Sequence, residues 1–347
     1  MAKSRVLTER KAAVLRALVH SYIRTGEPVG SEALAALASL GVSSATIRNE
    51  LAALEEMGFL TQPHTSAGRA PTDLAYRYYV DLLPSRPRLG DSERRAIVHF
   101  FDEALSDVDE ILRGTTILLS RLTRYASLAL APSPREISIA RAELVVLGTA
   151  TLILVVFDTG HVEKRMVELP QTSTPEDVES VSSWMMEAFK GKTLAAARAA
   201  ASDRRERAAE SERALWERAA EALGSIEAGA EAEHVVLGGV ANIAAEEAFA
   251  HRDTLRQVYE ALERESAILR LLREAAGTPP VSVTIGHENP MPEMWEASVV
   301  AAPYGAGGGP AGTIGVVGPI RMDYASAISA VRAVADRLSA AVEALVH

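Results

Sequence analysis

Arg48 and Asn49 are neighbouring side chains whose chemistry suits the reading of DNA bases. Arginine and asparagine can each form two hydrogen bonds at once, with the major-groove edges of guanine and adenine respectively. Ala45 and Ala52 lie within one helical turn of this pair, and such small neighbours let a helix enter a groove. The alternative is a polar pair on the outer face of an ordinary amphipathic helix, which is common. The surrounding residues favour DNA recognition.

The same stretch has an apolar stripe that gives the helix an inner face. Ile47, Leu51 and Leu54 follow one another at i, i+4 and i+7, which predicts an amphipathic helix. Ser43 and Ser44 stand at its start, where capping explains serine better than nucleophilic catalysis does. The helix therefore buries one side and presents Arg48 and Asn49 on another.

A wing is predicted directly after this helix. Residues 59–61 favour a short strand, and residues 62–68 form a polar loop that returns at Arg69. An arginine at that return is placed to reach a phosphate or the minor groove. The candidate DNA-binding residues are therefore Ser43, Ser44, Thr46, Arg48, Asn49, His64, Thr65, Ser66 and Arg69.

The elements that must position these residues lie upstream. Helical spacing of apolar residues predicts a first helix over residues 8–24 and a second over residues 31–40. Residues 41–43 are a glycine-containing turn between the second helix and the recognition helix. Two helices joined in this way make a helix-turn-helix, so residues 1–83 are predicted to be a winged helix-turn-helix domain.

Charge is distributed unevenly along the 347 residues. Residues 1–80 hold 9 Lys and Arg against 7 Asp and Glu, whereas residues 81–347 hold 27 against 39, and the net charge is −10. An acidic protein repels phosphate over most of its surface, so DNA binding must be local to the first domain and strengthened by a dimer. The chain has no cysteine, which excludes disulfides and thiolate metal sites. No apolar run approaches the roughly 18 residues of a membrane span, which predicts a cytoplasmic protein, nucleoid-associated when bound to DNA.

Beyond residue 83 the pattern predicts an α+β fold with an insertion. Residues 84–90 are a proline-rich linker, and helices are expected over residues 91–106 and 108–130. Four β-rich segments and a helix, residues 137–190, follow, and β character resumes at residue 281. The segment between, residues 191–276, is rich in Ala, Arg and Glu and mainly helical, with one strand candidate at residues 234–238. We expect it to be inserted into the sheet domain as a dimerisation or partner arm.

Other patterns that could indicate catalysis or ligand binding are better explained by structure. The glycine-rich residues 305–312 lack the Lys-Ser/Thr of a phosphate loop and are expected to join two strands. The eight histidines show no metal-ligand spacing, so no metal or cofactor is predicted. Tyr76, Tyr78 and Tyr79 are expected to pack a helix against the wing rather than to stack on bases. Glu288 could face a small ligand, although a structural role is favoured.

Several segments resemble, nearly letter for letter, the HrcA family of heat-inducible transcription repressors. They are residues 43–50 (SSATIRNE), 54–58 (LEEMG), 62–69 (QPHTSAGR), 76–81 (YRYYVD), 304–309 (YGAGGG) and 312–324 (GTIGVVGPIRMDY). The resemblance implies a winged helix, a GAF-like α+β domain made of residues 84–190 and 277–347, and a mostly helical dimerisation domain inserted at residues 191–276. It also implies an inverted-repeat operator of the CIRCE type upstream of chaperone genes, a homodimer, and modulation by the GroEL chaperonin.

Three functions remain in competition at this point. The leading one is a dimeric repressor that binds double-stranded DNA at an inverted repeat. The alternative is a metabolite-gated winged-helix regulator that uses the GAF-like domain as its sensor. An enzyme with an accessory helix-turn-helix is third, because no acid-base pair, metal cluster or nucleophile stands out.

Overall fold

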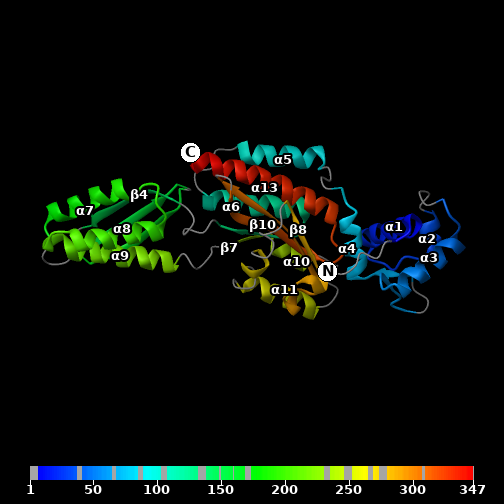
Figure 1. Cartoon of the computed structure of the whole chain (residues 1–347). Coiled ribbons are helices and arrows are strands. Elements are labelled where there is room, and N and C mark those ends of the chain that lie inside the picture. The colour runs from blue at the N-terminus through cyan, green and yellow to red at the C-terminus, as the bar shows by residue number, and fades with distance from the viewer. Residues whose placement is uncertain are drawn as a thin grey trace.

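The computed structural model describes most of the chain. The described residues are 7–36, 41–64, 68–84, 89–102, 108–131, 138–147, 150–158, 160–168, 173–229, 235–245, 252–264, 269–272, 280–306 and 309–346. Figure 1 shows three parts in a row: the N-terminal helices, a central sheet with helices on both sides, and a separate sheet with its own helices. None of the helices in the described ranges is long and apolar enough to cross a membrane.

The N-terminal part is a helix-turn-helix, as predicted. Its three helices are α1 (Glu9–Thr25), α2 (Ser31–Ala36) and α3 (Ser44–Glu56). Thr8 caps α1 by accepting a hydrogen bond from the backbone N–H of Lys11, and Gly26 ends it in the left-handed conformation with φ 69°. The last residues of the predicted second helix, 37–40, lie outside the described residues.

The wing is also present. Strand β1 (Leu60–Thr61) pairs antiparallel with β2 (Ala70–Pro71), and α4 (Asp73–Asp81) follows at once. The hydroxyl of Thr72 donates to the carbonyl of Gly58 at 2.8 Å, which ties the start of α4 to the end of α3.

The central part is built on an antiparallel sheet. Its strand order is β7-β3-β10-β9-β8. The strands are β3 (Ala126–Leu130), β7 (Val235–Gly238), β8 (Ser282–Ile285), β9 (Ala297–Ala306) and β10 (Gly309–Pro319). The glycine-rich segment joins β9 to β10, as the sequence indicated. Helices cover both faces: α5 (Asp91–Asp102), α6 (Val108–Thr123) and α13 (Tyr324–Val346) on one, α10 (Ala241–Ala245) and α11 (Arg252–Glu263) on the other.

Alternation along β9 explains why this sheet is buried on both sides. Val300 packs into the core beneath α6 and α13, whereas Val299 and Ala301 pack into the core on the α11 side. Successive side chains of a strand point to opposite faces, so one strand supplies both cores. The core on the α6 and α13 side continues without a break into the winged helix, where it includes Leu18 and Ile47.

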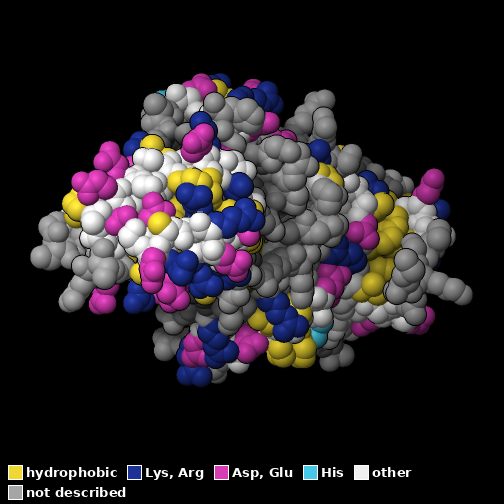
Figure 2. Space-filling model, turned by 60° about the vertical axis from the view of Figure 1, so that its left-hand side comes forward, with side chains coloured by type: hydrophobic (Ala, Val, Ile, Leu, Met, Phe, Trp, Pro, Cys, Tyr) yellow, Lys and Arg dark blue, Asp and Glu magenta, His cyan; other side chains and the backbone are white. Residues whose placement is uncertain are grey.

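The third part is a separate folding unit. Strands β4 (Ile139–Leu147), β5 (Ala150–Phe157) and β6 (Val162–Val167) form their own antiparallel sheet. Helices α7 (Pro175–Ala188), α8 (Leu194–Arg207) and α9 (Glu210–Gly229) pack with it around a core that contains the fully buried Trp216. We call this assembly the β4–α9 unit. Figure 2, in which this end of the molecule comes forward, shows acidic and basic side chains interspersed over its visible face.

The position of this unit corrects the sheet to which residues 137–169 were assigned. The sequence placed the strands of residues 137–169 in the main sheet and the insertion at residues 191–276. In the structure β3 pairs antiparallel with β7, so the chain leaves the main sheet after Leu130 and returns to it at Val235. An insertion at residues 191–276 would divide α7 from α8. It would also assign to the inserted part β7, which is a strand of the main sheet, and α10 and α11, which pack on that sheet. The inserted part also contains a three-stranded sheet beside its three helices.

A missed strand caused this error. The expected helix over residues 108–130 ends at Thr123, Arg124 takes a positive φ of 63°, and β3 begins at Ala126. All five residues of β3 are buried, so their sequence shows no two-residue alternation. A short, continuous apolar run cannot be told from the end of a buried helix by periodicity alone.

Candidate DNA-binding interface

The start of α3 is fixed by a local cap. Ser43 has extended backbone angles, and its hydroxyl accepts a hydrogen bond from the backbone N–H of Thr46 at 3.2 Å. The hydroxyl oxygens of Ser43 and Thr46 are 3.0 Å apart and share a second hydrogen bond. The capping role predicted for Ser43 is confirmed. The remaining backbone N–H groups of this first turn, which begins at Ser44, form an end that favours a phosphate.

The inner face of α3 is held by apolar and charged contacts. Ile47, Leu51 and Leu54 are buried, as their spacing predicted. The carboxylate of Glu50 forms an ion pair with Nζ of Lys11 of α1 at 2.9 Å, and Nη1 of Arg10 lies 3.9 Å from the same carboxylate. These contacts set the orientation of α3 on α1. The sequence reasoning missed them, although an acidic residue beside a buried stripe is the signal that could have suggested a partner on α1.

The outer face of α3 carries the proposed reading residues. Ala45, Arg48, Asn49 and Ala52 are all exposed. Within the described part of the chain, the side chains of Arg48 and Asn49 form neither an ion pair nor a hydrogen bond. Both are therefore available to an external partner, and the alanines on either side leave their approach open.

The base of the wing is tied to the helix-turn-helix. The backbone N–H and carbonyl of Arg69 pair with the carbonyl and N–H of Val29, both at 2.9 Å. Gly68 permits this approach, because a Cβ at that position would lie 2.4 Å from the carbonyl carbon of Val29. The side chain of Arg69 is 21% exposed and its Nε donates to Glu55 on α3 at 2.8 Å. Sequence reasoning predicted a freer Arg69 and did not name Glu55 or Gly68.

Of the other wing candidates, only His64 falls within the described residues. His64 is exposed on the loop after β1. Thr65 and Ser66 lie outside the described residues. The structure therefore brings Ser43, Thr46, Arg48 and Asn49 together at the start of α3.

Helix α4 packs the wing against the rest of the molecule, as predicted for its tyrosines. Tyr76 and Tyr79 are buried, and the ring of Tyr78 meets Phe59 edge-on at 5.7 Å. Burial raises the pKa of Tyr76 well above its usual range, and the neighbouring Tyr324 of α13 adds to this effect. These rings are structural, because two of them are covered and the third packs under the wing.

Two polar contacts fasten α4 to the central sheet. The guanidinium of Arg77 donates to both carboxylate oxygens of Glu288 and to the carbonyl of Val283. Asp73 accepts from the backbone N–H of His287 at 3.0 Å and lies 2.8 Å from its Nδ1. The structural role favoured for Glu288 is thus confirmed.

Comparison with known proteins identifies the family. Residues 6–81 match a family model described as the winged helix-turn-helix transcription repressor, HrcA DNA-binding domain, and residues 109–328 match the HrcA protein C-terminal domain. The chain belongs to the HrcA family. Members of this family are heat-inducible transcription repressors with a winged-helix DNA-binding domain, which are not enzymes.

Curated relatives agree along nearly the whole chain. The "Heat-inducible transcription repressor HrcA" of Nocardia farcinica is 42% identical over 329 residues, with 94% of each chain covered. The protein of the same name from Thermobifida fusca is 43% identical over 331 residues, with 95% of each chain covered. A solved structure of a hypothetical protein superposes with a TM-score of 0.68 over 98% of this chain and all of that one, at 23% identity, which shows that the fold is shared.

Proposed function

We propose that the chain represses heat-shock chaperone genes by binding, as a homodimer, an inverted-repeat operator of the CIRCE type. The observation that carries this proposal is the exposed pair Arg48 and Asn49 on a capped, rigidly held α3. Each copy would place α3 in the major groove of one half-site, with Ser43, Ser44 and Thr46 beside the DNA backbone. The wing residues His64, Thr65, Ser66 and Arg69 would contact phosphate or the adjacent minor groove.

The β4–α9 unit supports the homodimer. Ile153, Val155 and Phe157 of β5 are buried in the unit's own core, so the intervening side chains of β5 point to the opposite face of the sheet. On that face Leu152 stands opposite Met166 of β6, which is 65% exposed. The same face carries the exposed Lys164 of β6 and the Arg141–Glu143 ion pair of β4. An exposed apolar patch with polar neighbours marks an association surface.

A second copy of the chain is the occupant that we propose for this face. Three side chains on this face are each about half exposed or more: Leu147 of β4, and Val162 and Met166 of β6. A two-fold contact between two such faces would join two winged helices into one molecule, as an inverted repeat requires. We propose that the central sheet with its helices is the GAF-like domain, which links the DNA-binding winged helix to the pairing β4–α9 unit.

Activity of this repressor would depend on the GroEL chaperonin. We propose that warming depletes the native, DNA-binding population and that the chaperonin regenerates it, so that chaperonin occupied by damaged proteins releases the target genes. The site of this activity would be the cytoplasm, on the nucleoid when the operator is bound. Warmed repressor should regain operator binding with chaperonin and ATP but not with a chaperonin defective in substrate binding. Full, chaperonin-independent recovery on cooling would indicate an intrinsic thermometer instead.

Substitution of the reading residues tests the proposal. Arg48→Ala and Asn49→Ala should each lower affinity for the operator by about 1–3 kcal/mol per half-site, because each removes a contact with a base edge. Affinity for a scrambled duplex of equal length should fall far less, and thermal unfolding should match the parent. Operator binding equal to that of the parent at matched salt would show that α3 does not read bases.

A further inference from the structure

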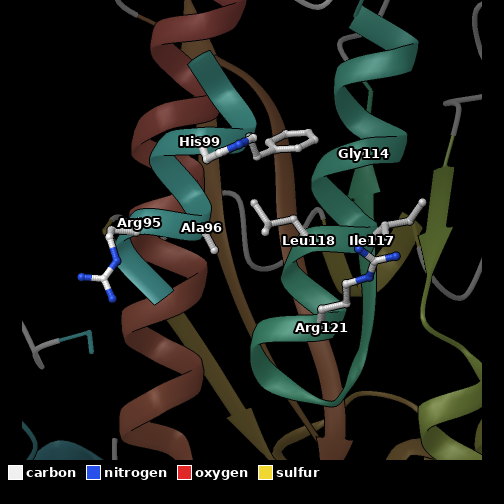
Figure 3. A pocket seen from close by; sticks show the side chains of 8 residues that line it. Arg95, Ala96, His99, Gly114, Ile117, Leu118 and Arg121 are labelled. Atoms are coloured by element: carbon white, nitrogen blue, oxygen red, sulfur yellow. The ribbon is translucent and has the colours of Figure 1, made fainter. Parts of the chain in front are cut away.

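A groove lies between α5 and α6 on the outside of the central domain. Figure 3 shows side chains of both helices that surround it, with Leu118 between the two helices, and Phe100 of α5 also lines it. Its cavity volume is about 510 Å³. Small-molecule sites are typically roughly 300–1,000 Å³. The groove belongs to the central part of the molecule, away from α3 (Figure 1).

Gly114 shapes this groove. It occupies the interior of α6, where glycine is a poor helix former. A Cβ at this position would lie 2.6 Å from the ring of Phe100, which crosses from α5. The glycine therefore allows the ring to lie against α6 and to form part of an apolar floor together with Leu118. Ile117, which also lines the groove, is 46% exposed and leaves apolar surface in contact with water.

The rim of the groove is basic. Arg95 and His99 of α5 and Arg121 of α6 line it, and among the described lining residues there is no acidic side chain. Within the described residues neither Arg95 nor Arg121 forms an ion pair. This local charge contrasts with a net charge of −10 for the chain. Figure 3 shows Arg121 beside Ile117 and Leu118, whereas the Arg95 side chain extends outward from α5 at the edge of the groove. An apolar floor with guanidinium groups at its rim is complementary to a molecule with an apolar body and an anionic head.

We propose that this groove binds a small amphiphile with an anionic head group, a carboxylate or a phosphate monoester. Its apolar chain lies along Phe100, Ile117 and Leu118, and its head pairs with the guanidinium of Arg95 or Arg121. Arginine matches either anion with two parallel hydrogen bonds. The inference does not depend on operator binding, because the groove belongs to the central domain and is assayed without DNA.

Calorimetric titration of the full-length protein tests this proposal. The probes are decanoate, decyl phosphate and the neutral decanol, each kept below the concentration at which it self-associates. We expect saturable binding of at least one anion with one molecule per chain, and at least tenfold weaker binding of decanol. A preference for decanoate or for decyl phosphate identifies the head group.

Variants assign the binding to the groove. The double variant Arg95→Gln/Arg121→Gln should raise the Kd of the anion at least tenfold and leave that of decanol unchanged. Ile117→Gln should weaken both probes. Arg95, Arg121 and Ile117 are all exposed, so the variants should unfold at the temperature of the parent. Arg113→Gln, which removes an exposed cation of α6 outside the groove, should bind like the parent.

Three results would overturn the proposal. They are the absence of saturable binding by either anion, equal affinity for decanol and the anions, and a loss in Arg113→Gln as large as in the double variant. The first would mean that the groove does not serve a small molecule. The others would mean that the anions bind through bulk hydrophobicity or bulk charge.

Discussion

The winged helix and the β4–α9 unit lie at opposite ends of the molecule and present surfaces of opposite character (Figure 1). The winged helix exposes Arg48 and Asn49, two polar side chains that no described residue engages. The β4–α9 unit exposes apolar side chains such as Met166 on an uncovered sheet face. The first surface suits DNA and the second suits another copy of the chain. In this account, recognition and pairing are separate, and the central sheet connects them.

Removing the pairing end should have the largest effect. Leu130 of β3 stands opposite Val235 of β7, so residues 132–234 can be replaced by a short Gly-Ser turn that closes a β-hairpin. We expect a folded monomer whose affinity for an inverted repeat is lower by about 10²–10⁴-fold, because two linked heads no longer bind together. Light scattering and titration of the operator measure the two effects.

Point variants separate the sheet face from the rest of the unit. Val162→Glu/Met166→Glu places two charges on exposed positions of β6 and should also yield monomers. Ser183→Glu adds a charge to an exposed position of α7 and should remain dimeric. A dimer that survives the hairpin deletion would move the pairing contact to the central domain.

Within the winged helix, Arg69 could either contact DNA or only hold the wing in place, and a variant separates these two roles. If its terminal nitrogens reach a phosphate, Arg69→Ala should weaken operator and scrambled DNA together and flatten the plot of log K against log salt by about one unit per half-site. Glu55→Gln, which removes the ion-pair partner on α3, should leave that slope unchanged. An unaltered slope in Arg69→Ala would limit this residue to holding the wing on the helix-turn-helix.

The smallest effect concerns the backbone beneath the wing. Gly68→Ala should lower the free energy of unfolding by about 1–3 kcal/mol, because the new Cβ must displace the backbone of Val29. Gly30→Ala is the matched control, since a Cβ there meets nothing within 4 Å. Thermal unfolding of the two variants measures the difference. Equal stability would mean that the wing shifts without cost.

The two ends also differ in how far the sequence predicts them. In the winged helix, the period of Ile47, Leu51 and Leu54 and the cap at Ser43 are local signals, and both predictions are confirmed. The contact of Arg69 with Glu55 joins residues on different elements, and nothing in the local pattern announces it. Local spacing therefore predicted the helix and the face that carries the proposed reading residues, but not the contacts that hold that helix.

For the rest of the chain, most strands were found, but not the sheet to which each belongs. The segments of β4, β5 and β6 were recognised as β-rich, yet the sequence placed them in the wrong sheet. The deciding fact is the pairing of β3 with β7, which joins residues about a hundred positions apart. Hydrophobic alternation gives the face of a strand but not its neighbour, so such a long-range pairing is invisible to it.

The most direct test of the account is a salt series with the full-length chain on an inverted-repeat operator and on a scrambled duplex. We predict one dimer per operator and an affinity at least about 10³-fold above that for the scrambled DNA at physiological salt. Arg48→Ala should remove most of this difference while leaving the dimer intact. Equal affinities for the two duplexes, or a specificity unaffected by Arg48→Ala, would contradict the claim that α3 reads the operator.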